Sequence, residues 1–294
     1  GAASKEMPDA TVFDYYIAQA VAIDINSLNA NEPRVPRYDR FEQGAGLLNL
    51  PGTFAALEKR GLTKAIEYIV EAPSLRATYT ETAHGVYATS RLPESITFTV
   101  RKSAAEPIDP TEHNFDRDFD VTSDTAWVTV KNPRMVLNGL NETPVVVDID
   151  QTALANLPVG VHMVRITGRH AGVQEWVFDI TYVKARELNE TFNRGEFYDP
   201  AVYLLPGAIT RYHFFVGTER TRIRASLRVP VLDANGNVTE GKYRMTISDP
   251  TGRRVVETEY ATGKNPLLQF QQLDPLTGVW EITIFRSYAT KDDP

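Results

Sequence analysis

From about residue 76 onward, the chain alternates apolar and polar residues with a period of two. The run 94–102 is typical, because Ile96, Phe98 and Val100 alternate with polar residues. A β-strand turns successive side chains to opposite faces, so this repeat predicts strands with one face in a core. The expected strands cover residues 94–102, 126–130, 144–150, 161–172, 175–183, 209–217, 222–231, 242–249, 254–260 and 278–287.

Short stretches rich in glycine, proline, aspartate and asparagine separate many of these runs. Residues of these types favour turns, and no long helical repeat lies between the runs. The pattern predicts a mainly β chain with two consecutive antiparallel β-sandwiches. We expect the first to resemble a fibronectin III or immunoglobulin domain and the second a jelly roll. The turn stretches are residues 158–160, 233–237, 249–252 and 274–278.

The first part of the chain has a different periodicity. Phe13, Ile17 and Val21 follow the spacing of a helix face, which predicts a helix over residues 9–28. A second short helix is expected over residues 51–60. The apolar face of the first helix needs a covering surface, and a homo-oligomer is one way to supply it.

The change of periodicity and one long polar stretch suggest the domain boundaries. Residues 184–200 form the longest polar interruption between strands. We expect a helical tail over 1–72, a first sandwich over 73–185 and a second sandwich over 186–294.

Composition and charge narrow the classes of function. The chain has 294 residues, of which 42% are hydrophobic and 23% charged, as in soluble globular proteins. Its formal net charge of −7, without a lysine or arginine cluster, argues against nucleic-acid binding. No apolar stretch approaches the roughly 20 residues of a membrane helix. There is no cysteine, which excludes disulfides, thiolate zinc sites and cysteine nucleophiles.

The first candidate site is a row of aspartates, Asp116, Asp118 and Asp120. Alternate residues of a strand share a face, so three carboxylates would project from one side. Carboxylates this close repel one another unless a cation or a basic side chain lies between them. The default interpretation is a solvated strand edge, and the alternative is a divalent-cation site.

A second candidate is the segment that holds Asp233, Asn235 and Asn237. Oxygen-bearing side chains at alternate positions resemble half of a calcium loop. An EF-hand loop needs glycine at its sixth position, where this chain has Val238. Because Asn-Gly is a strong hairpin signal, a turn is favoured over calcium. We expect no other cofactor.

Catalytic patterns are missing from the sequence. No serine lies in a Gly-x-Ser-x-Gly motif, and no two histidines have the i, i+4 spacing of a helical metal site. The sequence therefore shows no catalytic triad of its own. The histidines are His84, His113, His162, His170 and His213.

The stretch Phe41 to Leu50 contains a Gly-Ala-Gly step at Gly44 and Gly46. It lacks the third glycine of a dinucleotide-binding loop and the Gly-Lys-Ser/Thr of a P-loop. We interpret the two glycines as a tight turn before Pro51.

Five segments resemble, in the same order, the end of the catalytic domain and the following region of subtilisin-like serine peptidases of the tripeptidyl-peptidase II type. The segments are residues 41–57, 84–91, 125–139, 145–168 and 203–216. The resemblance covers roughly residues 38–230. The motif positions that carry it are Gly44, Gly46, Trp127, Asp148, Gly160, His162, Pro206, Gly207 and Arg211.

The resemblance implies that the catalytic aspartate, histidine and serine lie before residue 1, in a parent peptidase. This chain would then support the catalytic domain of the same parent chain and mediate assembly or access of peptide substrates. A secreted parent is mildly favoured, with a cytoplasmic one as the alternative.

Two other functions remain open. One is a stand-alone module that binds carbohydrate or a cell surface through a row of aromatic residues. That row would comprise Tyr198, Tyr203, Tyr212 and Trp280. The other is a metal-stabilised adhesion domain that uses the aspartates of residues 116–124.

Overall fold

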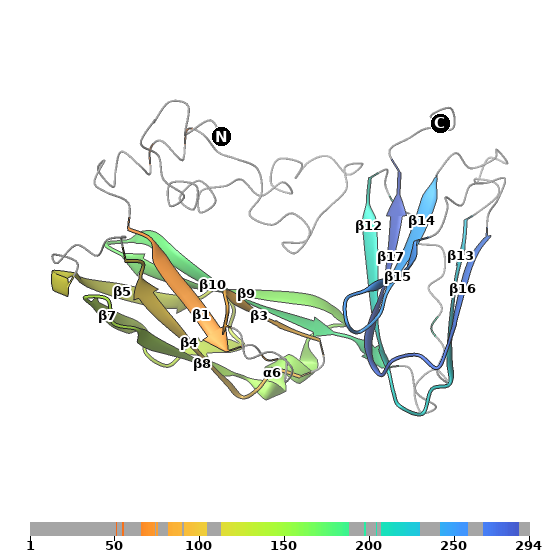
Figure 1. The fold of residues 1–294 in the computed structure, drawn as a ribbon, viewed down its shortest axis with the longest axis horizontal. Coiled ribbons are helices and arrows are strands. Elements are labelled where there is room, and N and C mark those ends of the chain that lie inside the picture. Colours follow the sequence, from red (N-terminus) through yellow and green to blue (C-terminus); the bar gives the residue numbers. More distant parts are fainter. Residues whose placement is uncertain are drawn as a thin grey trace. The chain divides into compact units, whose positions relative to one another are not determined.

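The computed structural model describes two compact units of the chain (Figure 1). The chain passes from the first unit to the second after Tyr182. Within the described ranges, no helix has the length and apolar character of a membrane span. The described residues are 51, 55, 66–73, 75, 82–89, 91–104, 113–187, 197, 204, 207–229, 242–257 and 267–287.

One sheet of the first unit has the strand order β2–β1–β4–β8–β6. Its strands pair antiparallel, with Val70 opposite Val100 and Phe98 opposite Val145. The bounds are β1 Tyr68–Pro73, β2 Thr82–Ala83, β4 Ser95–Lys102, β6 Val128–Val130 and β8 Thr143–Ile149.

The other sheet of the first unit has the order β3–β10–β9–β5–β7. A two-residue turn joins β9 to β10, and both of its residues have positive φ, 48° at Ala171 and 79° at Gly172. Such turns match the twist of a hairpin. In contrast to the antiparallel expectation, β3 pairs parallel with β10. The bounds are β3 Gly85–Ala88, β5 Asp116–Ser123, β7 Arg134–Asn138, β9 Gly160–His170 and β10 Val173–Lys184.

An aromatic cluster joins these two sheets into a sandwich. The rings of Phe98 and Phe178, one from each sheet, stack with centroids 4.1 Å apart. The Trp176 ring lies 6.1 Å from Phe98 and 6.0 Å from Phe119, centroid to centroid. All four side chains are buried. Large aromatic surfaces taken from water supply much of the stability of such a core.

One short helix, α6 (Gln151–Asn156), follows β8. The carboxylate of Asp150 accepts hydrogen bonds from the backbone amides of Thr152 and Ala153, both at 2.9 Å, and so caps the helix. The sequence pattern did not predict this helix, because a segment this short shows no clear repeat.

The second unit contains a five-stranded sheet, β11–β12–β17–β14–β15, and a two-stranded sheet, β13–β16 (Figure 1). Met245, Ile247 and Trp280 of the larger sheet pack with Leu268 of the smaller sheet. β11 runs parallel to β12. The bounds are β11 Arg186–Glu187, β12 Ile209–Val216, β13 Arg222–Arg228, β14 Tyr243–Ser248, β15 Arg254–Glu257, β16 Leu267–Leu273 and β17 Gly278–Arg286.

The turn predicted at residues 249–252 connects β14 to β15. The buried carboxylate of Asp249 accepts hydrogen bonds from the amides of Thr251 and Arg253 at 3.0 and 3.1 Å. Burial alone would raise the pKa of Asp249, but the hydrogen bond from the Thr251 hydroxyl and those from the two amides outweigh it and lower the pKa.

The mainly β fold expected from the alternation is confirmed, and each predicted strand run contains a strand. The expected boundary at residue 72 falls inside β1. The predicted helix over 9–28 lies outside the described residues. Of the helix expected over 51–60, only Pro51 and Ala55 are described, and both are helical.

Substitution of Gly168 by alanine tests the packing of the first core. An added Cβ would lie 1.9 Å from the Trp176 ring, so the ring would have to move. We expect Gly168→Ala to lower the free energy of unfolding by about 1–3 kcal/mol, measured by urea denaturation. In a Trp176→Leu background the same substitution should cost clearly less. Equal costs in both backgrounds would contradict this packing.

Candidate functional site

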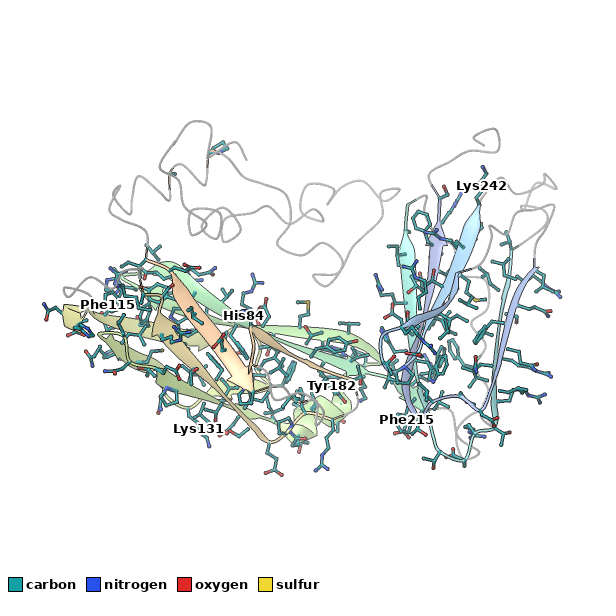
Figure 2. All side chains as sticks on the ribbon, viewed as in Figure 1. His84, Phe115, Lys131, Tyr182, Phe215 and Lys242 are labelled. Atoms are coloured by element: carbon teal, nitrogen blue, oxygen red, sulfur yellow. The ribbon has the colours of Figure 1, made fainter. Side chains whose placement is uncertain are left out.

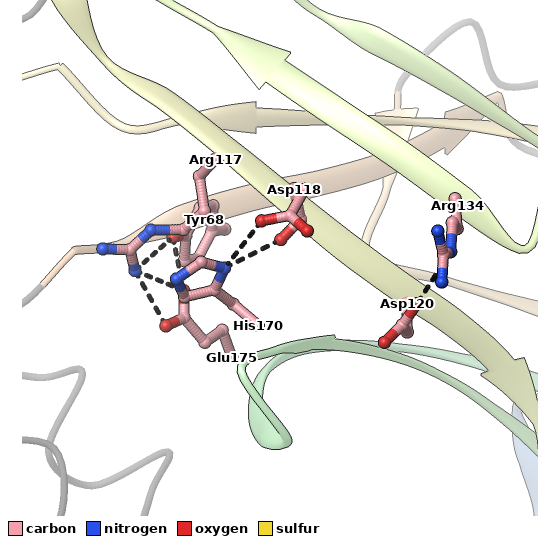
Figure 3. Close-up of polar contacts among 7 residues, drawn as sticks. All are labelled: Tyr68, Arg117, Asp118, Asp120, Arg134, His170 and Glu175. Atoms are coloured by element: carbon pink, nitrogen blue, oxygen red, sulfur yellow. Dashed lines mark hydrogen bonds and ion pairs between the residues drawn. The ribbon is translucent and has the colours of Figure 1, made fainter.

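The three aspartates of β5 lie on its exposed side, as the sequence predicts. Asp116, Asp118 and Asp120 are exposed, whereas Phe119 between them is buried. His170 Nδ1 lies 3.2 Å from Asp118 Oδ1, and Arg134 Nε lies 3.5 Å from Asp120 Oδ1 (Figure 3). Asp118 and Asp120 thus each have a basic residue of a neighbouring strand beside them, and only the Arg134 partner carries a permanent charge.

The described residues include no group of three histidine, cysteine, aspartate or glutamate side chains arranged to hold a metal ion. The divalent-cation interpretation of the aspartate row stays a prediction. The second calcium candidate, Asp233, Asn235 and Asn237, lies outside the described residues.

The opposite side of β5 carries a polar cluster that the sequence analysis missed. Arg117 Nη1 donates to both carboxylate oxygens of Glu175 at 2.8 Å (Figure 3). Tyr68 Oη donates to Glu175 Oε2 at 2.5 Å, and Arg117 Nη1 lies 3.3 Å from Tyr68 Oη. The Glu175 side chain is only 6% exposed. We call Tyr68, Arg117 and Glu175 the latch cluster.

The latch cluster connects the two sheets of the first unit, because Tyr68 lies on β1 whereas Arg117 and Glu175 lie on β5 and β10. Phe115 extends the cluster: its ring centroid is 5.6 Å from Arg117 Cζ and 5.5 Å from Lys102 Nζ. A buried carboxylate with two charge-assisted partners adds directional contacts to the aromatic core.

The protonation of the latch cluster suits a structural role. Burial, followed by the hydrogen bond to Glu175, raises the pKa of Tyr68, so its hydroxyl stays protonated. Burial alone lowers the pKa of Arg117, but Glu175 and Tyr68 outweigh this effect and raise it. A protonated phenol and a permanently charged guanidinium donate to both oxygens of the carboxylate. This arrangement does not activate a nucleophile or a base.

The second unit has its own polar cluster around Glu281 of β17. Arg211 Nη1 and Thr283 Oγ1 donate to Glu281 Oε1 at 2.5 and 2.7 Å. Nε2 of the buried His213 lies 3.7 Å from Glu281 Oε2. The approach of His213, with Thr283 and Arg211, lowers the pKa of Glu281 to about 2 against the opposing effect of burial.

The motif positions of the sequence resemblance are spread over both units. Trp127 is buried before β6, and its carbonyl accepts from the amide of Asp150 at 2.9 Å. Asp148 pairs with Lys131 at 3.0 Å on the surface of the first unit. Gly160 and His162 lie on β9.

The remaining motif positions fall in or near the second unit. Gly207 has a φ of 80° and donates its amide to Arg286 O at 2.8 Å, just before β12. Arg211 belongs to the Glu281 cluster. Gly44, Gly46 and Pro206 lie outside the described residues. The motif positions that the structure describes lie in turns and strands, and two of them, Asp148 and Arg211, form ion pairs.

The aromatic row required by a carbohydrate-binding module is not presented by the described residues. Trp280 is 3% exposed, and its Nε1 donates to Leu276 O at 2.8 Å inside the unit. The Tyr212 ring packs on Phe197 and Phe214 with centroids 5.8 and 6.4 Å away. Tyr198 and Tyr203 lie outside the described residues. A sugar ring could not stack on Trp280 in this fold.

The fold defines a β-sandwich protein. Most of the ion pairs among the residues that the structure describes join neighbouring strands of one sheet. No protein-family model and no curated protein sequence match the chain. Among solved structures, it is similar to the crystal structure of tripeptidyl peptidase 2 (TPP II), with a TM-score of 0.72 and 17% identity. The match covers 98% of this chain and 24% of that chain. The chain therefore has the fold of about a quarter of that peptidase.

Other solved structures are less similar. The secreted serine protease VesC from Vibrio cholerae has a TM-score of 0.34 and 8% identity, over 83% of this chain and 51% of that chain. The periplasmic chaperone SfaE has a TM-score of 0.27 and 7% identity, over 71% of this chain and 89% of that chain.

Neutralising Glu175 tests the latch cluster. Glu175→Gln leaves Arg117 without its counter-charge in a half-buried position. We expect the free energy of unfolding to fall by about 2–4 kcal/mol in urea denaturation. Asp120→Asn, which breaks the exposed pair with Arg134, is the control and should change it by less than about 0.5 kcal/mol. A similar small change for both variants would show that the latch cluster contributes little.

The Glu281 cluster predicts a pH dependence for the second unit. A carboxylate with a lowered pKa stabilises the fold above its ordinary pKa of 4.5, and this contribution disappears as the pH falls toward 2. The difference in urea midpoint between the unmodified protein and Glu281→Gln should therefore be constant above about pH 5 and shrink below it. Glu219→Gln, which removes the same charge from an exposed position, is the control and should change the urea midpoint little at pH 6. A difference that grows toward acid would contradict the prediction.

Proposed function

We propose that this chain is a non-catalytic accessory region of a subtilisin-like serine peptidase of the tripeptidyl-peptidase II type. The fold similarity to TPP II, with a TM-score of 0.72 over 98% of this chain, carries the proposal. The segments 84–91, 125–139, 145–168 and 203–216 support it independently, because they resemble that family in the same order.

In this proposal the chain has a structural role and takes no part in the chemical step. The parent would cleave peptide bonds through an acyl-enzyme on a serine of its catalytic domain. The present region would support that domain, and the aromatic core and the latch cluster would keep the supporting sandwich rigid. The saturated carboxylate of Glu175 and the raised pKa of Tyr68 agree with a structural task.

The proposal extends to assembly and to substrate access. The catalytic domain of the same parent chain would be the first partner, and further copies of the parent would be the second. Sandwich units stabilised by their own cores can bear such contacts without refolding. Peptide substrates would meet the parent and need not bind this region.

The encoding gene and a peptidase assay test the proposal. The gene upstream of residue 1 should encode a subtilisin-like domain with a serine at the start of a helix. The chain alone should not hydrolyse chromogenic tripeptides, whereas the parent protein should. Glu175→Gln in the parent should shorten the half-life of activity at elevated temperature by several-fold, and Asp120→Asn should not.

Two results would contradict this function. One is a gene without an upstream peptidase domain, and the other is peptide turnover by the chain alone, which would reveal a nucleophile within it. Inhibition of the parent by a serine-directed phosphonate would identify the class of nucleophile.

A further inference from the structure

The strand β13 carries a row of arginines on the side that faces away from the core. Its sequence is Arg-Ile-Arg-Ala-Ser-Leu-Arg. Ile223, Ala225 and Leu227 pack against the core of the second unit. The alternate residues are exposed, among them Arg222 and Arg228. Side chains project from both faces of the two-stranded sheet (Figure 2).

The partner strand β16 completes this outer surface. Arg222 lies opposite Leu273, Arg224 opposite Gln271 and Arg228 opposite Leu267. The two leucines are 59% and 38% exposed, for Leu273 and Leu267 respectively. We call this surface the arginine face. Its residues are Arg222, Arg224, Ser226, Arg228, Leu267, Gln269, Gln271 and Leu273.

The charges of the arginine face are not balanced within it. None of its eight residues is acidic. Arg224 Nε donates to the neutral Gln271 Oε1 at 3.0 Å, which orients the guanidinium but leaves its charge unbalanced. Within the described ranges, Arg222 and Arg228 form no ion pair. Like charges on alternate residues of one strand, about 7 Å apart, repel each other.

The aspartate row on β5 shows the contrast. That row is also a set of like charges at alternate residues, but Asp118 and Asp120 have basic partners from neighbouring strands. On the arginine face, Arg222 and Arg224 have the same spacing, and the part of the chain that the structure describes supplies no acidic partner to them.

We propose that the arginine face binds a carboxylate-rich polypeptide segment in extended conformation. A segment with aspartate or glutamate at alternate residues repeats its carboxylates about every 7 Å, which matches the spacing of Arg222 and Arg224. The guanidinium group pairs with a carboxylate through two parallel hydrogen bonds. Leu267 and Leu273 would cover apolar side chains of the same segment.

The composition of the arginine face favours a polypeptide over a nucleic acid. Three cations lie among glutamines and exposed leucines, and the leucines offer apolar contacts that side chains of a polypeptide can make and a phosphate backbone cannot. Arginine with exposed apolar side chains is typical of the contact surfaces between proteins. This inference does not depend on the peptidase proposal.

Titration with synthetic peptides tests the inference. The whole chain is titrated at 50 mM salt with a nine-residue peptide of alternating glutamate and threonine, and with the matching lysine peptide. Binding is followed by isothermal titration calorimetry. The glutamate peptide should bind and the lysine peptide should not. Changing Arg222, Arg224 and Arg228 together to glutamine should weaken binding at least tenfold.

A charge-matched variant controls for net charge. Changing Arg91, Arg134 and Arg169 of the first unit to glutamine removes the same charge from exposed positions. This control should retain affinity within about twofold, and its unfolding curve should be compared with that of the test variant.

Four outcomes would overturn the proposal. The first is an equal loss of affinity in the arginine-face variant and in the control variant. The second is a failure of the glutamate peptide to bind, and the third is tighter binding of a DNA 12-mer than of the glutamate peptide. The fourth is self-association, measured by light scattering, that only the arginine-face substitutions abolish, because the occupant would then be a second copy of the chain.

Discussion

The two-residue repeat of the β-strand is the constraint on which both units depend. It sends Phe119 into the aromatic core and Asp118 to the surface of β5. It likewise sends Ala225 inward and Arg224 outward on β13. A shift of one residue would bury the charges and expose the apolar side chains, at a large cost in free energy. The cores and the charged rows are therefore two results of one pattern.

Each unit contains a buried or partly buried glutamate that is paired with hydrogen-bond donors, because an unpaired buried charge is costly. Glu175 is almost fully buried and is satisfied by Tyr68 and Arg117. Glu281 is partly buried and is satisfied by Arg211 and Thr283. Each cluster links strands that are distant in the sequence, so each adds specificity to a core held mainly by apolar contact. The arginine face is the exception, because none of its own residues is acidic and, within the described ranges, Arg222 and Arg228 form no ion pair.

Much of the strand content could be predicted locally, and the misses have a physical cause. Runs such as β4 and β12 carry several β-branched or aromatic residues in alternation. The strand β1 contains a proline and a glutamate, and β16 contains three glutamines, so their composition hides the repeat. The placement of Asp116, Asp118 and Asp120 on one face of β5 could also be predicted, because it follows from the two-residue period of a strand alone.

The sequence alone determined the mainly β character, the turn at residues 249–252 and the exposure of the aspartate row, since these depend on neighbours within a few residues. Only the tertiary structure decided that Glu175 meets Tyr68, 107 residues away, and that Glu281 meets Arg211, 70 residues away. These contacts depend on which strands pair and in which register, and that pairing is a property of the whole sheet. Pairing also places the three arginines of β13 beside neutral residues and so leaves their charge unbalanced.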